Sequence, residues 1–217
     1  MADAILIPAI LTRDPEEIYE KLEYLESIPE ISEVHIDFAD GKMVPNLTAL
    51  PADLWPAKTR LKLEAHLMVG DPARYFHYLE HFGVRQIILH YESFAVISSL
   101  LTAARNIKAL GFGCGVAINP RTEVGVYDKI IDEIDIAQIM CVNPGFQGQP
   151  FIHETFDRLQ TLRKAHPDAI IQVDGGINLT NIEAIRAHGA NRIVVGSGIW
   201  QSKDPRERIY ELLEKLK

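Results

Sequence analysis

The sequence predicts one α/β domain, residues 1–217, folded as a single (β/α)8 TIM barrel. Short apolar runs rich in β-branched residues alternate with amphipathic helical patterns along the whole chain, without a low-complexity linker. A length of 217 residues suits such a barrel, which needs about 200 residues. Two of the apolar runs end in glycines, at Gly175 and Gly196, as expected for the phosphate site that follows the seventh and eighth strands of many such barrels.

Eight runs are expected to form the strands of the barrel. They cover residues 5–11, 33–38, 62–69, 86–91, 113–119, 136–142, 170–174 and 192–196. Their nearly continuous apolar character indicates burial on both faces of a parallel sheet. Because the carboxyl ends of the strands meet on one face of a barrel, functional side chains are expected there.

Helical patterns fill the segments between these strands, and eight helices are expected to alternate with them. The clearest patterns cover residues 15–25, 72–82, 94–110 and 182–188, and the last runs from residue 205 to the C-terminus. Several begin with Pro directly after Asp, as at Asp14 and Pro15. This pair is a helix-start signal, because proline is tolerated in the first turn.

The composition is that of an ordinary globular protein with an acidic surface. Its formal net charge of -8 argues against general nucleic-acid binding, although it permits a local site for a small anion. No apolar run approaches the roughly 18 residues of a membrane span, and the N-terminus 1–4 lacks the basic start of a signal peptide. Cys114 and Cys141 fall in apolar runs, which favours buried, reduced thiols. We therefore expect a cytoplasmic protein without membrane or nucleic-acid partners, and a homo-oligomer stays open.

Four polar side chains are expected to converge at the mouth of the barrel. His35 and Asp37 alternate along the second strand and so share one face, while His66 ends the third strand and Asp174 the seventh. Singly, a strand histidine is usually structural and a strand-end Asp usually caps a helix. Four such polar groups at one buried rim are costly unless they serve a site. Two imidazoles and two carboxylates suit one divalent metal ion, namely Zn²⁺, Fe²⁺, Mn²⁺ or Co²⁺.

A phosphate site is expected beside this cluster. Gly175 and Gly176 follow the seventh strand, and Gly196 and Ser197 follow the eighth, so both strand ends offer bare backbone amides. The segment after the sixth strand is rich in glycine, proline and phenylalanine, which favours a lid that brings amides to an anion and excludes water. Its candidate residues are Gly145, Phe146, Gln147 and Gly148.

Other polar residues have weaker signals. His90 and Glu92 end the fourth strand and stay unassigned, as either partners of the site or ordinary residues of the barrel mouth. Asp40, before a glycine, is expected to form a turn. Met68 and Met140 are expected to line the pocket. The remaining histidines fall on expected helices and are excluded from the site: His77, His81, His153, His166 and His188.

The motifs in this order resemble the ribulose-phosphate 3-epimerase family over nearly the whole chain. The matching segments are residues 8–11, 35–41, 44–48, 66–69, 143–146, 148–149, 173–177 and 196–197. The resemblance implies that His35, Asp37, His66 and Asp174 hold one divalent metal ion, and that Asp37 and Asp174 also act as acid/base catalysts. It further implies that His66 and Asp174 contact the substrate, and that the phosphate is received by Gly145 to Gly148, Gly175, Gly176, Gly196 and Ser197.

The resemblance also implies a reaction. One carboxylate removes the proton from C3, next to the ketone, the metal stabilises a cis-enediolate, and the opposite carboxylate returns a proton to the other face. The expected substrate is a small phosphorylated sugar, D-ribulose 5-phosphate, and the expected product is D-xylulose 5-phosphate. The protein is thus expected to be an isomerase of the pentose phosphate pathway.

Four positions depart from the family pattern and keep alternatives open. Ala9 stands for the usual Ser, Ala39 for Met, Cys141 for Thr and Gln147 for a lid glycine. A roomier pocket would suit a six-carbon substrate such as allulose 6-phosphate, and a sugar-phosphate-binding paralogue without catalysis is a further alternative. A carbon–carbon lyase with an Asp-x-Lys-x-x-Asp cluster is disfavoured, because no Lys lies between Asp37 and Asp40.

Overall fold

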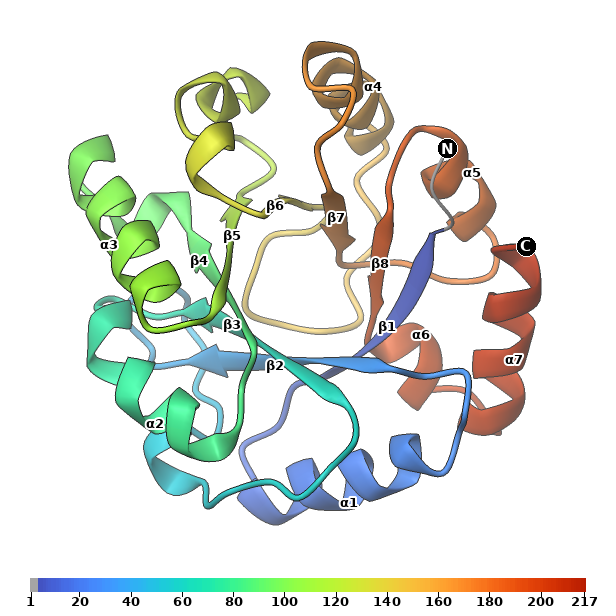
Figure 1. Ribbon diagram of the computed structural model, residues 1–217. Helices are drawn as coiled ribbons and strands as arrows, with labels where there is room; N and C mark the ends of the chain where they lie inside the picture. Colours follow the sequence, from blue (N-terminus) through green and yellow to red (C-terminus); the bar gives the residue numbers. More distant parts are fainter. Residues whose placement is uncertain (1–3) are drawn as a thin grey trace.

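The computed structural model describes residues 4–217 as a closed barrel of eight parallel strands (Figure 1). The strands are β1 (Ile5–Ile10), β2 (Glu33–Ala39), β3 (Lys62–Met68), β4 (Gln86–His90), β5 (Gly113–Ile118), β6 (Ile136–Met140), β7 (Ile171–Asp174) and β8 (Arg192–Val195). Each pairs with the next in chain order, and β8 closes on β1. The predicted fold class is confirmed, and every predicted strand lies within two residues of its observed bounds. Residues 1–3 of the N-terminus considered for a signal peptide lie outside the described residues.

Seven α-helices lie outside the strands within residues 4–217 (Figure 1). They are α1 (Pro15–Glu26), α2 (Phe76–Phe82), α3 (Ile97–Ala109), α4 (Thr155–Ala165), α5 (Ile182–Ala187), α6 (Ser197–Trp200) and α7 (Pro205–Lys215). The Asp-Pro signal is confirmed at α1 and α7, where the carboxylates of Asp14 and Asp204 accept hydrogen bonds from backbone amides of the first turn. The first turn of the pattern at 72–82 is the 3-10 helix Pro72–Tyr75.

The expectation that eight helices alternate with eight strands is wrong at two connections. Between β2 and β3 only the 3-10 helix Pro51–Asp53 forms, because Pro45, Pro51 and Pro56 interrupt the segment. Between β5 and β6 the chain forms the 3-10 helices Val124–Lys129 and Ile131–Glu133. The second connection is rich in β-branched residues, which are weak helix formers.

The main hydrophobic core lies between the strands and the helices that cover them. On β2, for example, Val34, Ile36 and Phe38 point outward into this core, in the same buried cluster as Leu22 and Leu25 of α1. Burying each such side chain contributes roughly 1.5–3 kcal/mol. The outward positions of the strands therefore hold the barrel together and leave the inward positions for other uses.

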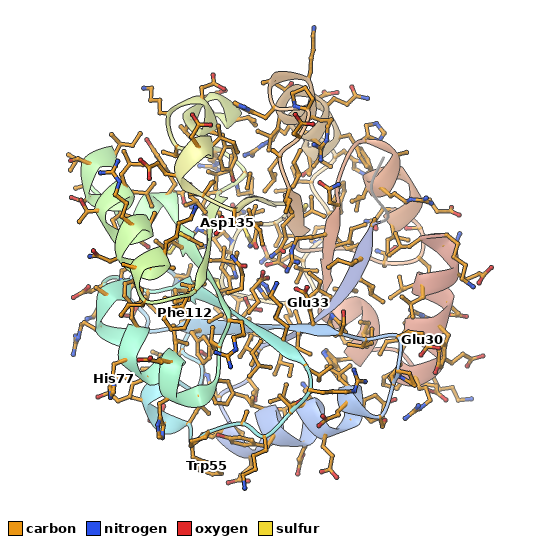
Figure 2. All side chains as sticks on the ribbon, in the orientation of Figure 1. Glu30, Glu33, Trp55, His77, Phe112 and Asp135 are labelled. Carbon is orange, nitrogen blue, oxygen red and sulfur yellow. The ribbon has the colours of Figure 1, made fainter. Side chains whose placement is uncertain are left out.

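The inside of the barrel is polar over much of its length, and side chains fill the ring of strands (Figure 2). Inward positions on β2, β3, β6 and β7 carry His35, Glu64, His66, Gln138 and Gln172, all with no exposed surface. Buried polar groups destabilise a protein unless they are hydrogen-bonded. The polar interior therefore requires a connected network of hydrogen bonds.

Two further expectations concern the chain as a whole. Among residues 4–217, no helix is both long enough and apolar enough to cross a membrane. Cys114 and Cys141 are both buried and free, as expected, and burial raises the pKa of Cys114 to about 12. These thiols therefore stay protonated and unreactive near neutral pH.

Candidate functional site

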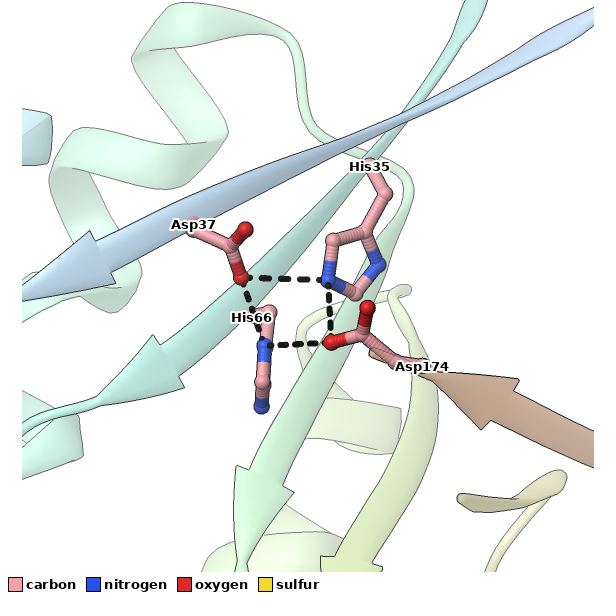
Figure 3. Close-up of side chains that lie close together, drawn as sticks. All are labelled: His35, Asp37, His66 and Asp174. Atoms are coloured by element: carbon pink, nitrogen blue, oxygen red, sulfur yellow. Dashed lines mark hydrogen bonds and ion pairs between the residues drawn. The ribbon is translucent and has the colours of Figure 1, made fainter. Parts of the chain in front are cut away.

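The four residues predicted to bind metal meet at the carboxyl ends of β2, β3 and β7 (Figure 3). One ligand atom from each lies within 4.8 Å of the others. The strand register explains the meeting, because Asp37 pairs with His66 across β2 and β3, and His35 lies two residues earlier on the same inward face. Asp174, the last residue of β7, reaches the same point from across the barrel (Figure 3).

Nitrogen and oxygen atoms alternate around this cluster (Figure 3). Nε2 of His35 lies 3.3 Å from Oδ1 of Asp37 and 3.9 Å from Oδ2 of Asp174. Nδ1 of His66 lies 2.7 Å from Oδ1 of Asp37 and 3.8 Å from Oδ2 of Asp174. Three of these four distances are too long for good hydrogen bonds, but they match the roughly 3–4 Å between ligands that each lie about 2.1 Å from one shared ion.

The state of His35 supports the same interpretation. Its Nε2 atom is buried and has no hydrogen-bond partner among the described residues. Its Nδ1 atom lies 2.6 Å from Oε1 of Glu64, a fully buried carboxylate. With the hydrogen on Nδ1, the lone pair of Nε2 faces the centre of the cluster, as a metal ligand requires. The donor set, its spacing and this orphaned nitrogen fit a divalent cation.

The second histidine is also held from behind. Nε2 of His66 lies 2.8 Å from Nε2 of His90, and Nδ1 of His90 lies 3.2 Å from Oε2 of Glu92. Burial is the main cause that lowers the pKa of His90 to about 4. The neutral ring donates from Nδ1 to Glu92 and accepts at Nε2 from His66. His66 is thereby left with the lone pair of Nδ1 facing Asp37. Of the two residues that the sequence left unassigned, His90 contacts a residue of the cluster directly, and Glu92 acts on it through His90.

Charges within the cluster separate the two carboxylates. Burial alone would raise the pKa of Asp37, but the neighbouring imidazoles of His35 and His66 outweigh burial and hold this pKa below its usual range. Burial and the charge of Asp37 raise the pKa of Asp174 to about 6. For His35, burial lowers the pKa, but Asp37 and Glu64 outweigh burial and raise it well above its ordinary value, so a proton and an ion compete for Nε2. Carboxylates with pKa values pushed apart are suited to acid/base work.

A pocket opens above the cluster at the carboxyl-end face of the barrel. Its lining includes Asp37 and Asp174, whereas His35 and His66 are fully buried beneath them. The other lining residues are Ala9, Leu11, Met68, Met140, Val142, Pro144, Gly145, Phe146, Gln147, Gly148, Gln149, Gly175, Gly176, Ile177, Gly196 and Ser197. All the residues predicted for the phosphate and the lid are in this set, as are the two methionines.

Glycines shape the side of the pocket next to β7. Gly175 and Gly176 have φ values of +108° and +66°, a conformation that favours glycine. A Cβ atom on Gly175 would lie 2.4 Å from Cγ2 of Val142, and one on Gly176 would lie 2.7 Å from the backbone nitrogen of Phe151. Only glycine lets the end of β7 approach the segment after β6 this closely.

The segment after β6 is fixed by side-chain amides. Nδ2 of Asn46 donates to the carbonyl of Gly145 at 2.6 Å, and Nε2 of Gln149 donates to the carbonyl oxygens of Asn143 at 2.6 Å and Phe146 at 2.8 Å. The ring of Phe146 is 48% exposed at the rim. The segment predicted to be a lid is thus a loop held by side-chain hydrogen bonds, with one exposed aromatic side chain in the pocket lining.

The positions that depart from the family pattern differ in their distance from the pocket. Ala9 lines it, but Ala39 is fully buried in a cluster with Val44 and Met68 and does not. The space expected at Ala39 is therefore filled by neighbouring side chains. A Cβ atom on Gly196 would lie 2.8 Å from Nε2 of Gln147 and 3.6 Å from Cβ of Ala9, so both side chains border Gly196.

The residues excluded on sequence grounds lie away from the cluster. His77 and His81 belong to α2, as expected, but His153 precedes α4, and His166 and His188 are the residues that follow α4 and α5. Three of the five therefore lie just outside the helices expected to contain them. Asp40 accepts a hydrogen bond from the backbone nitrogen of Lys42 at 3.1 Å, which confirms its role in a turn.

Sequence reasoning missed the polar residues below the cluster. Glu64, Gln138, Gln172 and Arg192 are buried on the inward face of their strands. Each stands where an apolar residue was expected, and Glu64 and Gln172 lie two residues before His66 and Asp174. For Glu64 and Gln172, a polar residue in phase with a site residue on the same strand was the signal that could have identified them.

Comparison with known proteins agrees with the geometry. The model of the ribulose-phosphate 3 epimerase family matches residues 5–200. The chain belongs to this family. Its members are isomerases that act on carbohydrate phosphates. The lyase alternative is not supported, because the family is an epimerase family and Ala39 stands where the lyase motif needs Lys.

Relatives from distant organisms share this family. Ribulose-phosphate 3-epimerase of Bacillus subtilis (strain 168) is 34% identical over 186 residues, which cover 82% of this chain and 84% of that protein. The enzyme of Aquifex aeolicus (strain VF5) is 37% identical over 177 residues, 79% of this chain and 78% of that one. The chloroplastic ribulose-5-phosphate-3-epimerase of Arabidopsis thaliana is 33% identical over 214 residues, 96% of this chain and 75% of that one.

Solved structures with lower identity share the fold. The 3-hexulose-6-phosphate synthase from Salmonella typhimurium has a TM-score of 0.69 at 16% identity, with 97% of both chains covered. A thiamine phosphate pyrophosphorylase from Pyrococcus furiosus has a TM-score of 0.62 at 13% identity, with 98% of this chain and 95% of that one covered. At such identities the likeness shows the barrel fold alone.

Proposed function

We propose that this protein inverts C3 of a ketose phosphate and that its substrate is D-ribulose 5-phosphate, which it converts to D-xylulose 5-phosphate. One observation carries the proposal. Of the four cluster residues, only Asp37 and Asp174 line the pocket, and they approach from β2 and β7, on different sides of the barrel (Figure 3). Two carboxylates on either side of one substrate carbon are what an inversion by proton transfer needs.

The two carboxylates are assigned as the acid/base pair. One takes the proton from C3, which is acidic because it lies next to the ketone, and the other returns a proton from the opposite face. The pKa of Asp174, raised to about 6 by burial and by Asp37, allows this carboxyl to hold or release a proton near neutral pH. The lowered pKa of Asp37 makes it the base in the direction in which Asp174 supplies the proton.

The residues present would hold one divalent ion through Nε2 of His35, Nδ1 of His66 and the carboxylates of Asp37 and Asp174. When bound, a divalent ion supplies Lewis-acid stabilisation of negative charge on the ketone oxygen. A set of two nitrogens and two oxygens suits Zn²⁺, Fe²⁺, Mn²⁺ or Co²⁺. His35 and His66 keep the two carboxylates in place from below, and Met68 and Met140 help to exclude water from above the cluster.

The phosphate is assigned to the glycine-rich side of the pocket. The lining of this part of the pocket includes Gly175, Gly176, Gly196 and Ser197, and the loop residues Gly145, Phe146, Gln147 and Gly148. None of the lining residues of this pocket is Lys or Arg. Backbone amides and the Ser197 hydroxyl are therefore the groups that would bind the dianion.

Proton exchange tests the reaction and the substrate together. We expect the protein to exchange the C3 proton of D-ribulose 5-phosphate with solvent deuterium and to form D-xylulose 5-phosphate. Allulose 6-phosphate in a parallel reaction tests the six-carbon alternative, which Ala9 in the pocket lining keeps relevant. Exchange with neither sugar would favour a paralogue that binds without catalysis. A cytoplasmic location and a homo-oligomeric state stay predictions.

Purified protein is expected to contain about one divalent ion per chain. His66→Ala should remove most of this metal, because it deletes one of the two nitrogen ligands. Elemental analysis after reconstitution with Zn²⁺, Mn²⁺, Co²⁺ and Fe²⁺ measures the content. His77→Ala, which deletes an exposed imidazole on α2, is the matched control. An unchanged metal content in His66→Ala would exclude this ligand set.

Metal uptake is expected to weaken as the pH falls, and Asp174 adds one proton to this competition below about pH 6. Because the pKa of Asp174 is raised to about 6, a proton competes with the ion for this carboxylate in more acidic solution. Displacing this proton lowers the apparent affinity by about a further tenfold for each pH unit. Titration of metal-free protein with Co²⁺ measures this slope. In Asp174→Asn the slope should be shallower by one proton, and identical slopes would contradict the raised pKa.

A further inference from the structure

A chain of buried hydrogen bonds runs through the barrel from Arg192 to His35. Arg192 is the first residue of β8, at the end of the barrel away from the pocket. Its Nε atom donates to Oε1 of Gln172 at 2.5 Å, and its Nη2 atom donates to Oε2 of Glu64 at 2.9 Å. Gln172 and Glu64 are joined at 2.6 Å, and Glu64 and His35 are joined at 2.6 Å. Gln172, Glu64 and His35 have no exposed surface, and Arg192 is 7% exposed.

The chemistry of Arg192 sets the direction of every bond in this chain. A guanidinium group can only donate, so the oxygen of Gln172 must face Arg192 and its nitrogen must face Glu64. Glu64 then accepts from Gln172 on Oε1 and from Arg192 on Oε2. A carboxylate that accepts at both oxygens is ionised, so it can only accept from its third partner, His35. The Nδ1 atom of His35 must therefore carry a hydrogen, which leaves Nε2 as the atom that can bind an ion.

We propose that Arg192 is a positioning residue for the metal ligand His35, an assignment that rests on the metal site proposed above. Through Gln172 and Glu64, its guanidinium keeps the hydrogen of His35 on Nδ1 and aims the lone pair of Nε2 at Asp37 and Asp174. Without this group, the oxygen of Gln172 loses its donor, only Glu64 and Gln138 still hold its nitrogen, at 2.6 Å each, and Glu64 loses its charge partner. Glu64, the acceptor for Nδ1 of His35, is then no longer held in place.

The neighbourhood of Arg192 offers a matched control. The same Nη2 atom also donates to Oε2 of Glu33 at 2.7 Å. Glu33 begins β2 and lies near the centre of the barrel in the view of Figure 2, but among the described residues no hydrogen bond or ion pair joins it to His35 or Gln172. Glu33→Gln therefore removes an ion pair of the same guanidinium and leaves the chain to His35 intact. A purely structural role of the Arg192 charge would make this variant behave like the others.

Zinc binding by the full-length protein tests the assignment. Metal-free wild type, Arg192→Met, Glu64→Gln, Glu64→Asp and Glu33→Gln are titrated with Zn²⁺ against a chromophoric chelator. We expect Arg192→Met and Glu64→Gln to bind Zn²⁺ about 10- to 100-fold more weakly, the usual effect of losing a group that orients a metal-binding histidine. Glu33→Gln should bind as tightly as the wild type. Glu64→Asp keeps an acceptor-only carboxylate and should recover most of the affinity lost in Glu64→Gln.

The Nδ1 hydrogen of His35 gives a second measurement that a structural role would not change. In the Zn²⁺-loaded wild type and in Glu33→Gln, proton NMR with ¹⁵N-labelled histidine should show this hydrogen in a strong bond to a buried carboxylate. The signal should be shifted or lost in Glu64→Gln, which has the shape of the original side chain and serves if Arg192→Met does not fold. Wild-type affinity and an unchanged signal in Glu64→Gln, or equal weakening in Glu33→Gln, would overturn the assignment alone. A wild type that binds no Zn²⁺ would overturn the proposed metal site and this assignment with it.

Discussion

Asp37→Asn and Asp174→Asn are each expected to lower the rate of epimerisation by roughly two to four powers of ten. Asparagine keeps the shape of the side chain and one oxygen, but it cannot accept or return the C3 proton, and general acid/base catalysis contributes about this factor. The loss would be larger where the ion also dissociates. Steady-state rates on both epimers, together with the metal content of each variant, separate the two effects.

The two Asp variants should also differ from each other in proton exchange. Because the two carboxylates approach from β2 and β7, each variant keeps the base for one epimer and should still exchange the C3 proton of that epimer without completing the inversion. Asp40→Asn is the matched control. Asp40 directly follows β2, but its carboxylate accepts a hydrogen bond from the backbone of Lys42 in a turn. Near-normal epimerisation by both Asn variants at the cluster would refute the two-base mechanism.

Gly196→Val is expected to weaken substrate binding by roughly a hundredfold while the metal stays bound. A Cβ atom at this position would lie 2.8 Å from Nε2 of Gln147 and 3.6 Å from Cβ of Ala9, so the branched side chain would occupy the space assigned to the phosphate. A hundredfold loss of affinity corresponds to losing two charge-assisted hydrogen bonds of about 1.5 kcal/mol each. The Michaelis constant for D-ribulose 5-phosphate and the affinity for inorganic phosphate measure the change.

A second glycine provides the control for this substitution. Gly125 lies in the 3-10 helix Val124–Lys129, and a Cβ atom there would meet only Oδ2 of Asp128, at 3.8 Å. Gly125→Val should leave both the Michaelis constant and the metal content as in the wild type. If Gly196→Val also keeps wild-type kinetics, the phosphate binds elsewhere in the pocket.

The sequence by itself determined the strands and much of the site. Continuous apolar runs predict buried parallel strands because both faces of each strand are covered. Period-two alternation places His35 and Asp37 on one face without any knowledge of the fold. Glycines after β7 and β8 predict that the backbone comes close to other atoms there. At Gly175 and Gly176 the positive φ values and the short distances to an added Cβ atom agree with this prediction.

Only the tertiary structure decided which polar groups touch. The contacts of Glu64 with Gln172 and Arg192 join β3 to β7 and β8, across 108 and 128 residues of sequence, and no local pattern encodes such a pairing. The separation of the pKa values of Asp37 and Asp174 likewise arises from burial and from charges supplied by other strands. Local sequence sets the face on which a strand presents a side chain, whereas closure of the barrel sets its partners and hence the electrostatic field in which it works.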